Sequence, residues 1–345
     1  MTTPAIEMVD GLPIFSAIEP ASIKPAIEKA IAACKSEIDE VVASKDYSYQ
    51  NLVLRLEEAD DRLSKIFSPV SHMNSVVSSD ELREAHDACL PLLSEYGTWV
   101  GQHEGLYNAY ASLKASDEFA TLSEEQQKVI ENAVRDFTLS GVALPAEQKK
   151  RFAEIQAKLS ELSSTFSNNV MDATMGWTKH ITDEAELAGM PESALEAAAQ
   201  AAHQKDLQGW LFTLDIPSYL PVMLYADNRE LREEMYRAYA TKASDQGPNA
   251  GKWDNTDIIK ETLTLRTELA ELLGFSSYAE RSLATKMADS TDQVIGFLRD
   301  LAAKSKPQAE KELEEVRAYA KDKHGVSELA AWDLPYYSEK LKQEK

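Results

Sequence analysis

Cysteine, glycine and proline are all scarce in this sequence, and their scarcity excludes several classes of protein. The 345 residues include only 2 cysteines, Cys34 and Cys89, which cannot form a disulfide framework or a cysteine-rich metal site. Each lies on an apolar helical stripe, so we expect two buried thiols in a reducing compartment. The 13 glycines and 13 prolines leave little room for fibrous or disordered structure, and a hydrophobic fraction of 43% is typical of a globular protein.

Long apolar runs and an excess of basic residues are also missing. No window approaches the roughly 20 apolar residues of a membrane span. The N-terminus lacks both the basic region and the long apolar region of a signal peptide. The formal net charge of -22 disfavours binding to nucleic acid or to an anionic membrane, because both partners are themselves negatively charged. We therefore expect a cytoplasmic protein with neither of these as a partner.

Helical periodicity is abundant, and its most regular example begins at Phe152. Apolar residues follow at alternating spacings of three and four, which places them on one face of a long helix: Phe152, Ile155, Leu159, Leu162 and Phe166. After Trp177 the period changes, and residues 177–182 and 210–216 alternate as half-buried strands do. The sequence predicts a mainly α fold, an elongated multi-helix body with a small antiparallel β element around 177–182 and 210–216.

Helix-start signals mark further helices along the chain. Ser123 and Gln126 have the spacing of a capping box, and Asp227 is placed to cap another helix. A long helix is expected to open at Ser290 and to continue past Pro307. We expect three parts: an N-terminal helical body (1–176), a small strand-containing insert (177–216), and further helices (217–345) that lead toward a catalytic domain outside this chain.

The residues that usually carry catalysis do not form a recognisable site in this sequence. His103-Glu104-Gly105-Leu106-Tyr107 begins like the zinc motif H-E-x-x-H, but a tyrosine stands at the second histidine position. There is no E-x-x-H pair, no phosphate-binding loop and no G-x-S-x-G turn. We therefore expect no catalytic, metal-binding or cofactor-binding residue in these 345 residues.

Asn168 and Asn169 are the most informative polar pair. Asn169 stands where the apolar stripe from Phe152 would place its next hydrophobic residue. A buried amide needs hydrogen-bond partners, because leaving it without them costs about 1–3 kcal/mol. Two interpretations stay open: the pair caps the helix where the strand region begins, or the two amides line the wall of a cavity.

Several stretches together resemble the thimet-oligopeptidase-like family of zinc metallopeptidases. They are SPVSHMNSV (68–76), LSEYGTWVGQHEGLY (93–107), SNNVMDATMGWTK (167–179), the run from Leu214 through RAYATKASDQGPNAGKWDN (237–255), LAELLGF (269–275) with KMA (286–288), and WDLPYY (332–337). The resemblance covers essentially the whole chain. It implies two mostly helical domains flanking a deep channel that admits short peptides, with Asn168 and Asn169 possible residues of that channel.

The resemblance also implies an activity. Members of the family are cytosolic endopeptidases that degrade oligopeptides, including cleaved signal peptides, and their zinc motif H-E-x-x-H lies in the second half of the protein. No residue of this chain matches that motif, so the chain resembles a non-catalytic N-terminal half. Its expected partners are the C-terminal catalytic half and short peptides, and we expect it to be inactive alone. The alternative is a stand-alone helical module that binds a peptide or a protein without catalysis.

Overall fold

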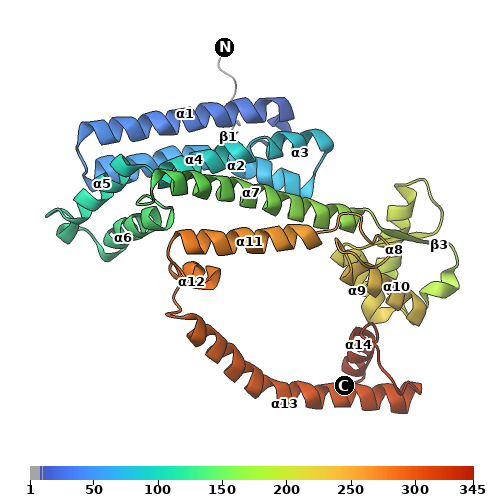
Figure 1. Ribbon diagram of the computed structural model, residues 1–345. Coiled ribbons are helices and arrows are strands. Elements are labelled where there is room, and N and C mark those ends of the chain that lie inside the picture. Colours follow the sequence, from blue (N-terminus) through green and yellow to red (C-terminus); the bar gives the residue numbers. More distant parts are fainter. Residues whose placement is uncertain (1–7, 10) are drawn as a thin grey trace. The chain divides into compact units, whose positions relative to one another are not determined.

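The computed structural model describes residues 8–9 and 11–345, and the chain divides into two compact units (Figure 1). Unit 1 contains the chain up to Ser164 together with Thr264–Tyr278. Unit 2 contains Thr165–Leu263 and Ala279–Lys345. Both units are built mainly from helices, so the predicted mainly α class is confirmed. In the part of the chain that the structure describes, every helix is too short or too polar to cross a bilayer.

Unit 1 is a set of packed helices preceded by a short strand pair. Its elements are β1 (Met8–Val9), β2 (Leu12–Pro13), α1 (Pro20–Ser44), a π-helical stretch (Tyr49–Leu54), α2 (Arg55–Val76), α3 (Asp80–Asp87), α4 (Leu90–Gly101), α5 (Glu104–Lys114), α6 (Glu124–Leu139) and the first part of α7 (Ala146–Met175). On α1, Ile27, Cys34 and Val41 are buried at helical spacing and form the face that packs on α2. Both cysteines are buried thiols, as predicted.

Unit 2 contains the predicted small sheet and the later helices. Its elements are β3 (Thr178–Ile181), α8 (Glu192–His203), β4 (Trp210–Thr213), α9 (Ile216–Tyr225), α10 (Arg229–Ala240), α13 (Thr291–His324) and α14 (Leu334–Glu344). Helices α11 (Thr256–Leu272) and α12 (Tyr278–Leu283) each contribute residues to both units. Strands β3 and β4 pair antiparallel, with Thr178 opposite Thr213 and Ile181 opposite Trp210. The predicted antiparallel element is therefore confirmed.

The core of unit 2 forms where β4, α9 and α10 meet. In β4 both Leu211 and Phe212 are buried, and the helices add apolar side chains at spacings of three and four. The fully buried members include Phe212, Leu214, Val222, Met223 and Met235. This core holds α10 in place, and the segment that carries the site described below begins where α10 ends.

Most of the predicted helix starts agree with the structure. The Ser123 hydroxyl accepts a hydrogen bond from the Gln126 N–H, and the Gln126 side chain accepts one from the Ser123 N–H, so the capping box is confirmed. Ser290 caps α13, which continues past Pro307 to His324. The cap predicted at Asp227 is wrong by one residue. Asn228 accepts the hydrogen bond from the N–H of Leu231, while the Asp227 carboxylate is engaged by the Tyr336 hydroxyl.

Candidate functional site

The last turns of α7 carry the predicted pair Asn168 and Asn169, both of which are half-buried. The helix does not end at these residues but continues to Met175. The helix-cap interpretation of the pair is therefore wrong, because the backbone groups around it are inside the helix rather than at its end. Phe166, which was expected on the buried stripe, is also 39% exposed.

Asn169 obtains a side-chain partner from a distant part of unit 2. Its Nδ2 donates to Oδ1 of Asn255 at 2.8 Å, and Asn255 Nδ2 donates to the carbonyl oxygen of Phe166 at 3.1 Å. Asn255 is only 2% exposed, and its backbone N–H donates to Ala243. Asn255 therefore connects the segment before α11 to α7 by two side-chain hydrogen bonds. Because the buried Asn255 amide needs a partner, position 169 requires a polar residue.

The segment from Thr241 to Asn255 is held in an unusual backbone conformation. Ala243 and Trp253 have φ values of 52° and 60°, in the left-handed region that few non-glycine residues adopt. Gly247 has a φ of 80°, and a Cβ there would lie 1.9 Å from the Thr241 hydroxyl oxygen, so only glycine fits. Backbone conformations of this kind are found preferentially at functional sites, where the surrounding structure maintains them.

Trp253 packs against the end of α7. A Cβ added to Gly176 would lie 2.1 Å from Cη2 of the indole, so the close approach depends on glycine at this position. The ammonium of Lys252 lies 4.0 Å from the centre of the Trp253 ring, a cation–π contact. The indole is half-buried and presents an aromatic surface beside Asn169's helix.

Lys242 adds a positive charge to the same segment. Its Nζ donates to the Thr174 hydroxyl on α7 at 3.1 Å and lies 4.0 Å from the centre of the Tyr239 ring. Tyr239 in turn stacks on Tyr219, with ring centres 4.2 Å apart. Burial lowers the pKa of Lys242, against a smaller opposing effect of Asp215. Amides, an ammonium and an indole can bind a peptide through hydrogen bonds, charge and apolar contact.

The side chains of this site do not form a set of metal ligands. Within residues 8–9 and 11–345, no group of three or more histidine, cysteine, aspartate or glutamate side chains could hold a metal ion. The site residues therefore do not fit the zinc ion that the family resemblance implies. We derive no reaction step through a metal in this chain.

A buried ion pair on α10 and α14 was not predicted from the sequence. Arg232 Nη2 donates to Asp333 Oδ1 at 2.9 Å, and the two side chains are 1% and 0% exposed. Arg229 Nη2 donates to the other carboxylate oxygen at 2.6 Å. Burial alone would raise the pKa of Asp333, but hydrogen bonds from Arg229, the Ala330 N–H and Arg232 outweigh it and lower the pKa.

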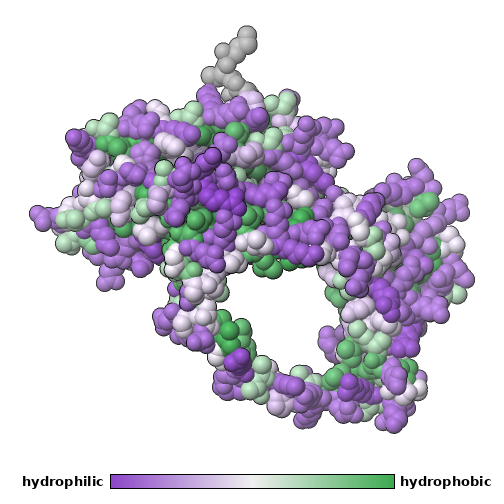
Figure 2. Space-filling view, in the orientation of Figure 1, coloured by the Kyte–Doolittle hydropathy of each residue, from purple (hydrophilic) through white to green (hydrophobic). Residues whose placement is uncertain are grey.

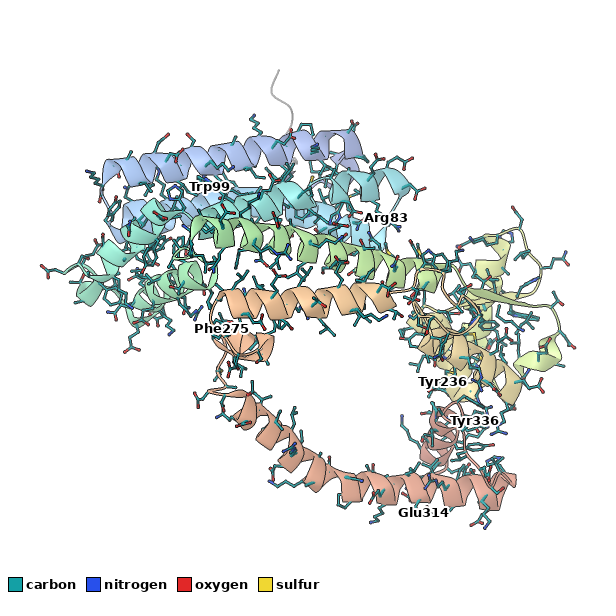
Figure 3. The ribbon with its side chains drawn as sticks, viewed as in Figure 1. Arg83, Trp99, Tyr236, Phe275, Glu314 and Tyr336 are labelled. Atoms are coloured by element: carbon teal, nitrogen blue, oxygen red, sulfur yellow. The ribbon has the colours of Figure 1, made fainter. Side chains whose placement is uncertain are left out.

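Aromatic rings surround this ion pair. The Arg232 guanidinium lies 4.0 Å from the centre of the Tyr336 ring, and Trp332 packs against Tyr236. Figure 3 labels Tyr236 on α10 and Tyr336 on α14, which belong to this cluster. The sequence signal was that Asp333 and Arg232 each lie in a stretch resembling a known family, 332–337 and the run from Leu214 to Asn255. Neither stretch indicates that Arg232 and Asp333, 101 residues apart, are partners.

Two family models match the chain. The model described as "Neurolysin/Thimet oligopeptidase, N-terminal domain" matches residues 27–149, inside unit 1. The model described as "Peptidase family M3" matches residues 222–345, inside which lie the segment 241–255 and the Arg232–Asp333 pair. Asn168 and Asn169 fall between the two matched ranges.

Similar proteins match nearly the whole chain. Oligopeptidase A of Salmonella typhimurium is 61% identical over 344 residues, a match that covers 99% of this chain and 50% of that protein. Oligopeptidase A of Escherichia coli is 60% identical over 344 residues, with the same coverage. A probable cytosolic oligopeptidase A of Arabidopsis thaliana is 37% identical and is covered over 49% of its length. This chain thus spans about half the length of these relatives, and by sequence it corresponds to the N-terminal half of the bacterial oligopeptidase A proteins.

Proposed function

We propose that this chain is the N-terminal, non-catalytic half of a cytoplasmic zinc metalloendopeptidase that degrades short oligopeptides, including cleaved signal peptides. The observation that carries the proposal is the 61% identity to an oligopeptidase A over 99% of this chain but only 50% of that relative. A peptidase needs a group that activates water and a group that polarises the scissile carbonyl. The described residues contain no metal-binding group, and the sequence contains no H-E-x-x-H motif. These groups would come from the C-terminal half, the partner that we propose.

We assign this chain a role in holding the substrate. Asn168 and Asn169 on α7, with Lys242 and Trp253 of the adjoining segment, would form part of the wall of a channel that admits unfolded peptides. The support for this role is chemical. Side-chain amides and an ammonium can pair with peptide carbonyls and with a C-terminal carboxylate, and the half-buried indole offers an apolar contact.

A chimeric protein tests the proposal. In the chimera, this chain replaces the matched half of the Escherichia coli relative, to which it is 60% identical. A quenched fluorescent oligopeptide is then offered to the chimera and to the 345-residue chain alone. We expect cleavage that a chelator abolishes with the chimera, and none with the chain alone.

The same experiment decides against the alternative, a stand-alone binding module. A folded chimera without peptidase activity, together with tight binding of the oligopeptide by the isolated chain, would support such a module and reject the proposed half-enzyme. Circular dichroism and thermal unfolding establish beforehand that the chimera is folded.

A further inference from the structure

Helix α13 is buried only near its C-terminal end. Tyr319 and Ala320 are buried there, in a cluster with Tyr336 and Tyr337 of α14. Every residue from Ile295 to Glu312 is exposed. A helix is stabilised in water mainly by packing of an apolar face, so a long exposed stretch of this kind needs an explanation.

The exposed part of α13 is not polar all around. Near its start it carries several large apolar side chains that are about half exposed or more: Ile295 at 46%, Phe297 at 64%, Leu298 at 54% and Leu301 at 51%. Figure 2 shows hydrophobic surface gathered over the first turns of α13, followed by mostly hydrophilic surface. Single exposed apolar residues are ordinary, but a contiguous set on one helix marks an interaction surface.

These residues continue the face that is already packed. Leu298 and Val316 are 18 residues apart, which is five turns of a helix with about 3.6 residues per turn, so both lie on the same side. Leu301 and Tyr319 have the same spacing. The face that α14 covers at the end of α13 is therefore left uncovered at its beginning.

We propose that this face, defined here by Phe297, Leu298 and Leu301, is the docking surface of α13 for the C-terminal half of the protein. The inference rests on the proposed function, because that half is the proposed partner. The relatives contain about as much chain again as the matched part, and the M3 family model covers α13 as well as α14. In the relatives, a second half of about the same length therefore belongs to the same polypeptide and is available to cover this face. Covering the stripe would extend the packing that α14 begins.

Cysteine labelling tests the surface separately from activity. Leu298→Cys is placed in the isolated chain and in the chimera, and the rate of maleimide labelling is compared. Ala303→Cys is the matched control, since it is exposed on the same helix about 140° around from Leu298. The native Cys34 and Cys89 are buried and provide a low background.

The expected result is that labelling of Leu298→Cys slows at least about tenfold in the chimera, because a thiol covered by a packed partner reacts only in the small fraction of molecules whose interface is open. Ala303→Cys should label at the same rate in both proteins. Equal rates for Leu298→Cys in both, or equal protection at both positions, would overturn the assignment. Protection in the isolated chain that grows with its concentration would also overturn it, because a second copy would then be the occupant.

The two proposals fail in different ways. If Leu298→Cys is protected in a chimera that has no peptidase activity, the docking surface stands and the proposed function falls. If the chimera is active while Leu298→Cys labels as fast as in the isolated chain, the proposed function stands and this surface is not the interface.

Discussion

Arg232 and Asp333 form an ion pair that is shielded from solvent, with a distance of 2.9 Å between Nη2 and Oδ1 and exposures of 1% and 0%. Arg232 also donates to the backbone carbonyl of Ala226. A buried charge without its counter-charge is far more costly than a paired one. This pair therefore connects α10 to the start of α14, and the packing of α14 depends on both residues.

Replacing Asp333 by asparagine should destabilise the protein strongly. The substitution keeps the size of the side chain but leaves the Arg232 guanidinium buried without a negative partner, at a cost of about 3–5 kcal/mol in the free energy of unfolding. Urea unfolding of the 345-residue chain measures it. Arg229→Ala is the matched control, because Arg229 is 50% exposed and its removal leaves Asp333 paired with Arg232, so we expect a smaller loss than for Asp333→Asn. Equal losses for both variants would contradict the assigned role of Arg232.

The same carboxylate predicts a pH dependence of stability. The folded state lowers the pKa of Asp333, so below its ordinary value, about 3.9, the unfolded chain binds a proton more readily than the folded chain. The stability from this group is thus fully present above that pH and is lost as the pH falls through the lower folded pKa. Urea midpoints between pH 2 and 7 should show a difference between the wild type and Asp333→Asn that shrinks toward acid. A difference that is constant with pH would argue against a charged Asp333.

Gly176→Ala should destabilise unit 2. The new Cβ would meet the Trp253 indole at 2.1 Å, and overpacking of this kind costs about 1–3 kcal/mol. Gly97→Ala in α4 is a control with the opposite sign. A Cβ there meets nothing within 4 Å, and replacing glycine by alanine inside a helix stabilises by up to about 1 kcal/mol. Thermal unfolding followed by Trp fluorescence measures both, and a neutral Gly176→Ala would show that the indole is free to move aside.

Asn169→Leu should lower stability by about 1–3 kcal/mol, because the buried Asn255 loses the donor that satisfies its carbonyl oxygen. A double-mutant cycle with Asn255→Leu separates this contact from other effects of the substitutions. We expect the double variant to be clearly less destabilised than the sum of the two single variants. Additive losses would mean that the two amides do not act on each other.

A role for Asn168 in the channel would appear in the kinetics of the chimera. Asn168→Ala should raise KM for an oligopeptide about threefold to tenfold, the loss expected for one hydrogen bond to the substrate. Asn132→Ala removes an amide of unit 1 that accepts from Arg135, and it should leave KM unchanged. If both variants behave alike, Asn168 does not contact the peptide.

The sequence predicted those features that depend on neighbours along the chain. The Ser123 capping box, the helix that passes Pro307 and the change of period after Trp177 all depend on residues within a few positions, and all three agree with the structure. Asn169 could be recognised as misplaced in an apolar stripe for the same reason. The division into 1–176, 177–216 and 217–345 stays a prediction.

The partners of the site residues could not be predicted. Asn255 is 86 residues from Asn169, and the segment that leads to it contains Ala243 and Trp253 in left-handed backbone conformations, which no local propensity favours. Asp333 is likewise paired across 101 residues. Periodicity shows which face of a helix is buried, but it does not show which distant polar group forms a hydrogen bond or an ion pair with a residue on that face.

The peptidase assay of the chimera and of the isolated chain tests the central claim most directly. If this chain is a non-catalytic half, the 345 residues alone leave the quenched oligopeptide intact, and the chimera with the C-terminal half of the Escherichia coli relative cleaves it until a chelator is added. Chelator-sensitive cleavage by the isolated chain at a rate comparable to that of the chimera would contradict the account.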